Sequence, residues 1–335
     1  MVEFTRFGRL CPHLERFAFA SVVDFAQWER RMLLSSDVCT QEGITRHDER
    51  SPFPALTSLT MTLHHDDIEL VAYLSNLTAL RTLDISNSQL FEVARGEHPS
   101  NIVSPSTAML WNELRGLTQL TNLELENVEW YPAVMDILTS SPIPKFLRRL
   151  VVEDDDKCEL SRSDIMTQPC GFGNPRDYSP LSAVVHLESL QIQWQMCRHH
   201  TEPSILKLPY LPSLREFGCR NYENTQFHWM SSMGTQFPAL TRVLLPDSCK
   251  VVGISPIADC PLVSHLEIRS AKLLGHFAFM SSVRRWFPGL RLLTFVADMA
   301  SASKLHPALL DDIREECRRN GIQLDVQLSP PAIID

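Results

Sequence analysis

The chain has 335 residues, of which 44% are hydrophobic and 21% are charged, and its formal net charge is -9. This apolar content is enough for a sizeable core, which excludes a disordered chain. The net acidity lacks the basic footprint of a general nucleic-acid binder, so we expect no nucleic-acid partner.

The N-terminus and the cysteines indicate an intracellular protein. Residues 1–17 include Glu3, Arg6 and Arg9 and contain no apolar stretch of the kind found in signal peptides. No apolar run approaches the roughly 18 residues of a membrane span, so we expect no contact with a membrane. The nine cysteines are odd in number and form no CxxC pair, which argues against a disulfide framework. We therefore expect reduced thiols in a cytoplasmic or nuclear protein.

One phrase recurs along the chain: an apolar residue, two polar residues, an apolar residue, any residue, and a further apolar residue. LRTLDI at 80–85 and LTNLEL at 120–125 are its clearest copies. Pro often stands one or two positions before the phrase, as in FPAL at 53–56. The first residues of the ten copies are Leu14, Leu56, Leu80, Leu120, Leu147, Leu187, Leu214, Leu240, Val263 and Leu290.

The spacing of these copies predicts a repeat solenoid. Six of the nine intervals between successive first residues are 23–27 residues long, which is within the range typical of solenoid repeats. The three intervals of 40–42 residues fit one repeat plus an inserted loop of about 15 residues, because insertions map to loops. We expect these loops near 34–51, 87–106 and 154–180.

The periods of the apolar residues predict strands that alternate with helices. Within each phrase, the fourth and sixth positions alternate with polar residues, which is strand periodicity. Stacked strands of this kind form a parallel sheet over a continuous core. Helical spacing follows at 68–74, 109–117 and 134–138, and again at His306–Arg319, before a last strand at Ile322–Val326.

The phrase with its helical connectors resembles the leucine-rich-repeat superfamily over residues 10–328. The resemblance implies an α/β horseshoe, with the parallel sheet on its concave face and helices on its convex face. We therefore expect a single solenoid of about ten repeats over 1–328, closed by a capping helix and strand at 306–328 and followed by a tail at 329–335. The Asn or Cys that usually stands ninth in the phrase is absent, so we expect an irregular turn after each strand.

Two further features narrow this resemblance. Repeats open with FPAL, CPLV or FPGL, and the chain closes with IREECRRNGIQLDV at 313–326. The closing stretch is similar to the last helix and strand of fungal F-box-type leucine-rich-repeat proteins, in which an F-box docks to a cullin-type ubiquitin ligase and the repeats select a substrate. No F-box is recognisable before the first phrase at Leu14. Because the apolar residues there lack an obvious cover, we expect either a preceding segment, such as one that carries an F-box, or a partner at that end.

The residues between the core positions are expected to face outward and to bind a protein. The middle repeats present acids there, the later repeats present mostly basic residues, and a tryptophan stands between the two groups. Charge complementarity steers a partner, and Trp and Arg are typical anchors. The candidate residues are Asp84, Glu124, Glu126, Glu153, Asp154, Trp194, Arg220, Arg242, His265 and Arg269. A solvated strand face is the alternative, because Glu216 and Glu267 lie among the basic residues.

The sequence shows none of the motifs for catalysis or cofactor binding that we sought: GxGxxG, the P-loop, GxSxG and HExxH are absent. Cys197, His199 and His200 lack the second ligand pair of a zinc site. The acids at 153–156 lack the glycine and the spacing of an EF-hand loop. We expect no catalytic residue, cofactor or metal. Three functions stay open: substrate recognition for a ubiquitin ligase, a scaffold or inhibitor without a ligase, and, remotely, an enzyme with its site in the insertion at 154–180.

Overall fold

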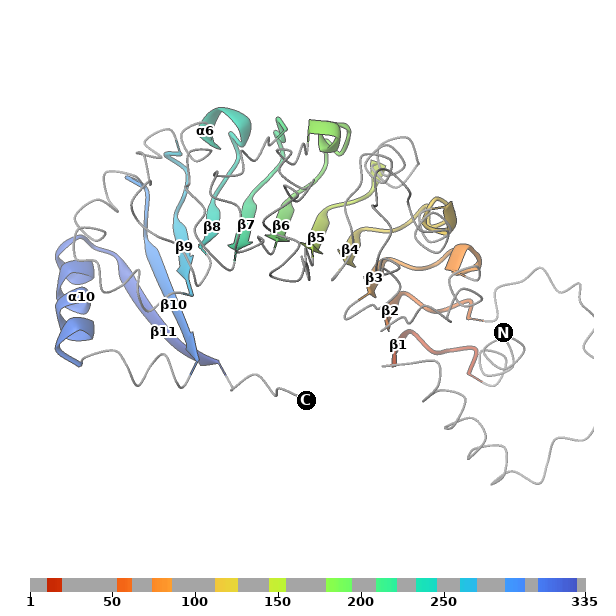
Figure 1. Ribbon diagram of the computed structural model, residues 1–335, viewed down its shortest axis with the longest axis horizontal. Coiled ribbons are helices and arrows are strands. Elements are labelled where there is room, and N and C mark those ends of the chain that lie inside the picture. Colours follow the sequence, from red (N-terminus) through yellow and green to blue (C-terminus); the bar gives the residue numbers. More distant parts are fainter. Residues whose placement is uncertain are drawn as a thin grey trace, which may run out of the picture. The chain divides into compact units, whose positions relative to one another are not determined.

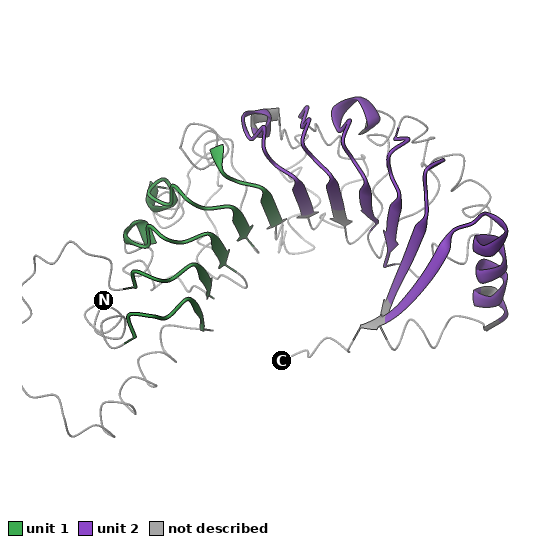
Figure 2. Ribbon diagram, turned by 180° about the vertical axis from the view of Figure 1, so that it is seen from behind, with its two compact units in different colours: residues 1–153 green, residues 154–335 purple. Residues whose placement is uncertain are grey.

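The protein is a parallel-sheet solenoid that divides into two compact units, residues 1–153 and 154–335, coloured separately in Figure 2. The computed structural model describes residues 11–19, 53–61, 74–85, 112–125, 145–154, 179–194, 209–221, 233–245, 260–269, 287–298 and 307–329.

In unit 1 a short strand starts at the third residue of each phrase, and successive strands pair in parallel in the order of the sequence (Figure 1). The strands are β1 (Arg16–Phe19), β2 (Ser58–Met61), β3 (Thr82–Ile85), β4 (Asn122–Leu125) and β5 (Arg149–Asp154). A 3-10 turn, η1 (Leu74–Asn76), precedes β3. The predicted parallel sheet is therefore confirmed in this unit.

Unit 2 repeats the arrangement with longer strands, which also pair in parallel and in sequence order. The strands are β6 (Ser189–Trp194), β7 (Glu216–Asn221), β8 (Arg242–Leu245), β9 (His265–Ile268), β10 (Leu292–Asp298) and β11 (Gln323–Ser329). The helical elements of this unit are η3 (Ser179–Ala183), α6 (Met233–Gln236) and α10 (Pro307–Arg319).

The connectors are described only in part. Of the helix predicted at 109–117, residues 112–114 are helical. Of the helix predicted at 68–74, only Leu74 is described, and it begins the 3-10 turn η1. The helix predicted at 134–138 lies outside the described residues. The three expected insertions also lie outside them, except that Asp154 ends β5 and residues 179–180 begin η3. Helices along the whole convex face therefore stay a prediction.

The core follows the phrase. In β2, β3 and β4 the buried residues alternate with half-exposed ones. Leu83 and Ile85 are buried, whereas Thr82 and Asp84, which alternate with them, are partly exposed. Each fully buried leucine or isoleucine stabilises the fold by roughly 1.5–3 kcal/mol, so the stacked rows supply most of the cohesion between repeats.

A turn that sequence analysis did not identify adds another core column. The backbone NH of the first phrase residue donates to the carbonyl three residues earlier, as from Leu240 to Phe237 at 3.1 Å and from Leu290 to Phe287 at 3.0 Å. The residue that carries this carbonyl is buried in the core, as both phenylalanines show. The Pro of FPAL, CPLV and FPGL stands second in the turn, where its fixed φ is favoured.

Within each unit, backbone hydrogen bonds lock neighbouring repeats together at the start of the strands. The carbonyl of Thr57, second in its phrase, accepts from the NH groups of both Arg81 and Thr82, at 2.8 and 2.9 Å. The carbonyl of Thr241 likewise accepts from Ser264 and His265, at 2.9 and 3.1 Å. This repeated clamp keeps equal phrase positions side by side.

The two end strands differ in how well their core positions are covered. Leu14 and Phe17 in the first repeat are only half-buried, whereas the equivalent Leu56 and Leu59 are fully buried. At the other end α10 packs Ile313 and Cys317 into the core, close to the predicted His306–Arg319 helix.

A glycine closes α10. Gly321 has a φ of 67°, and the NH of Ile322 donates to the carbonyl of Cys317 at 2.8 Å, as in a Schellman helix end. Burial, with a contribution from Glu316, raises the pKa of the Cys317 thiol to about 11, so it remains protonated.

Gly289 tests how closely neighbouring turns pack. A Cβ atom at this position would lie 2.4 Å from the carbonyl oxygen of Pro261, which is backbone and cannot rotate away. Gly289→Ala is expected to lower the free energy of unfolding by about 1–3 kcal/mol, measured by urea denaturation. Ala239→Ser, at the same place in its own turn, is the control and should change stability by less than about 0.5 kcal/mol. Equal effects of the two variants would contradict the close packing.

Candidate functional site

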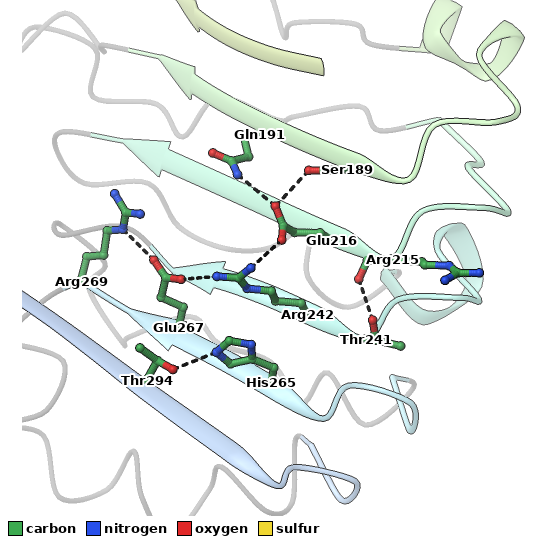
Figure 3. Close-up of polar contacts among 10 residues, drawn as sticks. All are labelled: Ser189, Gln191, Arg215, Glu216, Thr241, Arg242, His265, Glu267, Arg269 and Thr294. Carbon is green, nitrogen blue, oxygen red and sulfur yellow. Dashed lines mark hydrogen bonds and ion pairs between the residues drawn. The ribbon is translucent and has the colours of Figure 1, made fainter. Parts of the chain in front are cut away.

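The partly exposed side chains of the strands form the strand face, defined as the third and fifth positions of each phrase and the residues that continue each strand. In unit 2 the face carries a network of polar residues on five strands: hydrogen bonds link β6 to β9, and a further contact joins β9 to β10 (Figure 3). The residues in this network are Ser189, Gln191, Glu216, Arg242, His265, Glu267, Arg269 and Thr294.

Glu216 on β7 collects three donors. Its Oε1 atom accepts from Ser189 Oγ at 2.9 Å and from Gln191 Nε2 at 3.0 Å, both on β6. Its Oε2 atom accepts from Arg242 Nη1 on β8 at 2.9 Å. The carboxylate is therefore saturated by its neighbours and held in one orientation.

Glu267 on β9 is the most buried charge of the described face, with 4% of its surface exposed. Arg242 Nη2 donates to its Oε2 atom at 2.7 Å, and Arg269 Nε donates to its Oε1 atom at 2.9 Å. Burial acts to raise the pKa of Glu267, but the hydrogen bonds and charges of Arg269 and Arg242 outweigh burial and lower it. Two arginines thus keep a buried carboxylate ionised.

His265 continues the network to β10. Its Nε2 atom lies 2.9 Å from the hydroxyl of Thr294, which is 3% exposed. Burial lowers the pKa of His265, and the positive charge of Arg242 lowers it further. Three carboxylates oppose this shift: Glu267, Glu216 and Asp325. The imidazole is therefore held neutral to a lower pH than a free histidine.

The charges on the face of unit 2 are balanced within the described network. Arg242 bridges Glu216 and Glu267, and Arg269 pairs with Glu267. The sequence predicted a more basic face in these repeats. In the described network the arginines are instead paired with glutamates. Both glutamates appear in the sequence at outward phrase positions, but only the register shows that they meet the arginines.

The acidic part falls in unit 1, where Asp84 on β3 lies directly opposite Glu124 on β4. Burial raises the pKa of Asp84, and the neighbouring Glu124 carboxylate raises it further, against a hydrogen bond from Thr60 and the charge of Arg149. Arg149 Nη1 lies 3.4 Å from Glu124 Oε2. The Oδ1 atom of Asp84 has no hydrogen-bond partner in the described part of the chain. Two of the predicted acidic residues, Asp84 and Glu124, therefore lie side by side on neighbouring strands.

For the other candidate residues the structure describes only the strand in which the backbone lies, or does not describe the residue. Trp194 lies in β6 opposite Asn221, and Arg220 lies in β7 opposite Gln193, so the two are neighbours in register. Glu153 and Asp154 end β5. Glu126 and the 197–200 segment lie outside the described residues.

Comparisons with known proteins identify no relative. No family model matches this chain, and a search of curated proteins finds no match. Among the described residues, no group of three His, Cys, Asp or Glu side chains is arranged to hold a metal ion. No helix in the described ranges is long and apolar enough to cross a membrane.

Arg242 is predicted to stabilise the strand face of unit 2. Arg242→Met leaves Glu216 and the buried Glu267 each without one ion-pair partner. We expect a loss of about 1–3 kcal/mol in unfolding free energy, less than for a fully buried pair because Arg242 is partly exposed and Arg269 remains. Urea denaturation measures the loss, and combining the variant with Glu267→Gln should recover part of it.

The control for this variant is Arg314→Met on α10. Arg314 pairs with Asp311 at 2.8 Å, but both side chains are more than half exposed. Removing this pair should cost less than about 0.5 kcal/mol. A similar cost for Arg242 and Arg314 would show that the network contributes no more than a surface pair.

His265 is predicted to make stability depend on pH. Its folded pKa lies below the ordinary value of 6.5, so the unfolded chain binds more protons in the window between the two values. The contribution of neutral His265 to the unfolding free energy is fully present above pH 6.5 and is lost as the pH drops through this window. Urea midpoints measured from about pH 7.5 to about pH 5 should fall for the wild type and fall less for His265→Gln. Glu267 does not interfere, because its contribution is lost only below its ordinary pKa of 4.5. Identical slopes for both proteins would refute this assignment.

Proposed function

We propose that the chain is a leucine-rich-repeat protein-interaction module that recognises a substrate protein for a cullin-type ubiquitin ligase. The repeat spacing, the buried phrase positions and the parallel strands support the leucine-rich-repeat assignment. The ligase connection is supported by the resemblance to fungal F-box-type proteins in the closing helix and strand.

The shape of the strand face is the observation that favours a protein as the partner. Parallel strands about 4.8 Å apart present their side chains in rows, and such an extended surface suits a polypeptide rather than a small molecule. In unit 2 the polar groups are already oriented by one another, so little side-chain entropy is lost on binding. A non-ligase scaffold or inhibitor would use the same face, and the partner's identity separates these functions.

The acidic pair in unit 1 sets the charge of the expected partner. Asp84 and Glu124 lie side by side, and the pKa of Asp84 is raised by burial first and by the neighbouring Glu124 carboxylate second. A lysine or arginine of the partner placed between the two carboxylates would relieve their repulsion. We therefore expect the bound segment to be basic at this point.

Reversing the charge of this pair tests the proposed function. Affinity purification of the full chain from its source cells, followed by quantitative mass spectrometry, should recover one substrate protein together with cullin-ligase subunits. Asp84→Lys with Glu124→Lys is expected to reduce the substrate at least about tenfold, because each like-charge contact costs more than 1 kcal/mol. Ligase subunits should be unaffected.

The matched control makes the same charge change on α10, as Asp311→Lys with Asp312→Lys, both at exposed positions. Substrate recovery with this control should equal that of the wild type. Recovery of a stable partner without ligase subunits would replace the ligase function by a scaffold or inhibitor. Undiminished substrate binding by the Asp84 and Glu124 variant would exclude the strand face of unit 1 as its site.

A further inference from the structure

A second surface of unit 2 lies at the edge where the strands begin. The turns before β6 to β10 follow one another in the order of the paired strands, and we call their two central residues the turn ridge: 185–186, 212–213, 238–239, 261–262 and 288–289. Adjacent turns pack directly, because Gly289 leaves no room for a Cβ atom against the carbonyl of Pro261. The ridge contains no Asp, Glu, Lys or Arg, and His186 and Ser213 are its only polar side chains.

The ridge exposes large apolar side chains. Val185 is 46% exposed and Leu262 is 56% exposed. Tyr210, which directly precedes the buried first residue of the turn before β7, is 58% exposed. The remaining large exposed apolar residue of the described chain, Phe146, precedes β5 at the equivalent place in unit 1. Exposed apolar side chains gathered at one kind of position mark an interaction site more often than scattered ones do.

Turn geometry does not require these side chains. Proline at the second turn position serves the backbone, but apart from Phe146 the described turns of unit 1 carry polar or small residues where unit 2 carries Val185 and Leu262. His13, Thr118 and Gln119 are examples, and all three are exposed. The apolar choice in unit 2 therefore has no explanation in the fold of the turn.

Two arginines border the ridge. Arg215 and Arg291 each follow the first core residue of their phrase, both are exposed, and neither forms an ion pair with a described residue. Between them stand the hydroxyls of Thr241 and Ser264. Figure 3 shows the Arg215 side chain extending away from the network of Glu216, and only its backbone carbonyl bonds to Thr241, at 3.1 Å.

The ridge is rigid before it binds anything. Proline fixes φ in four of its five turns, and a backbone hydrogen bond closes each turn. A preorganised apolar edge loses little conformational entropy on association, and exposed Tyr and Arg are the residues most enriched at interface hot spots.

We propose that the turn ridge of unit 2 binds an extended segment of a partner protein in which apolar side chains alternate with Asp or Glu. The apolar side chains cover Val185, Tyr210 and Leu262, and the carboxylates pair with Arg215 and Arg291. Two arginines three repeats apart suit a few carboxylates better than the dense charge of a nucleic acid. This surface is separate from the strand face and does not depend on what that face binds.

A synthetic probe tests the proposal with the full chain. Five turns at least about 4.8 Å apart span about 20 Å, which an extended peptide of about eight residues covers. One fluorescein-labelled peptide alternates Leu or Tyr with Glu, and a second has Lys in place of Glu. Fluorescence anisotropy should show that the acidic peptide binds at least about tenfold more tightly than the basic one and weakens as salt is raised.

Variants locate the binding. Arg215→Glu with Arg291→Glu should weaken the acidic peptide at least about tenfold, and Val185→Ser with Leu262→Ser should weaken it several-fold. Arg81→Glu is the matched control, because Arg81 is exposed at the same phrase position in unit 1 and should leave binding unchanged. Thermal unfolding confirms that each variant remains folded.

Several outcomes would overturn the proposal. No binding of the acidic peptide, equal binding of the basic peptide, or an equal loss with Arg81→Glu would each exclude a specific acidic segment at the ridge. Competition by a single-stranded oligonucleotide that depends on both arginines would assign the ridge to nucleic acid. Self-association abolished by Val185→Ser with Leu262→Ser would make a second copy of the chain its occupant.

Discussion

Within each unit, the structure depends on a backbone contact that recurs at the start of successive strands. The carbonyl of the second phrase residue accepts hydrogen bonds from two successive NH groups of the next repeat, as Thr57 does from Arg81 and Thr82. This contact sets where the next strand begins, and a shift by one residue would turn its core side chains outward. Because the contact recurs, equal phrase positions stand in rows. The rows of leucines become the core, and the rows between them become the strand face.

The rows explain why the two units offer different electrostatics from the same phrase. In unit 2 the register places Arg242 between Glu216 and Glu267, and opposite charges on neighbouring strands neutralise one another. In unit 1 it places Asp84 opposite Glu124, and among the described residues the charge of Arg149 and a hydrogen bond from Thr60 partly offset their repulsion. The first face holds paired charges in fixed orientations, whereas the second is where we propose that a cationic group of the partner binds.

The turn before each strand serves both packing and surface chemistry. Its first residue, such as Phe237, belongs to the core, while its central residues, such as Leu262, point to solvent. Proline suits the turn because it fixes φ and donates no hydrogen bond, and its ring adds to the exposed apolar surface. The same rigid element that anchors the core thus builds the turn ridge.

The sequence by itself determined the repeat, the parallel sheet and the core rows, because these follow from the period of apolar residues. It also indicated the closing helix and strand, seen at Pro307–Arg319 and Gln323–Ser329. It placed Asp84 and Glu124 on one face, since alternation along a strand is local.

Only the tertiary structure decided which charges meet. Glu267 lies 25 residues from Arg242 in sequence, and their ion pair exists because β8 and β9 pair in register. The burial of Thr294 and the lowered pKa of His265 likewise depend on side chains from neighbouring strands. The buried turn residues and the exposed ridge were also decided there. A turn becomes core on one side and surface on the other only when the next repeat stacks against it.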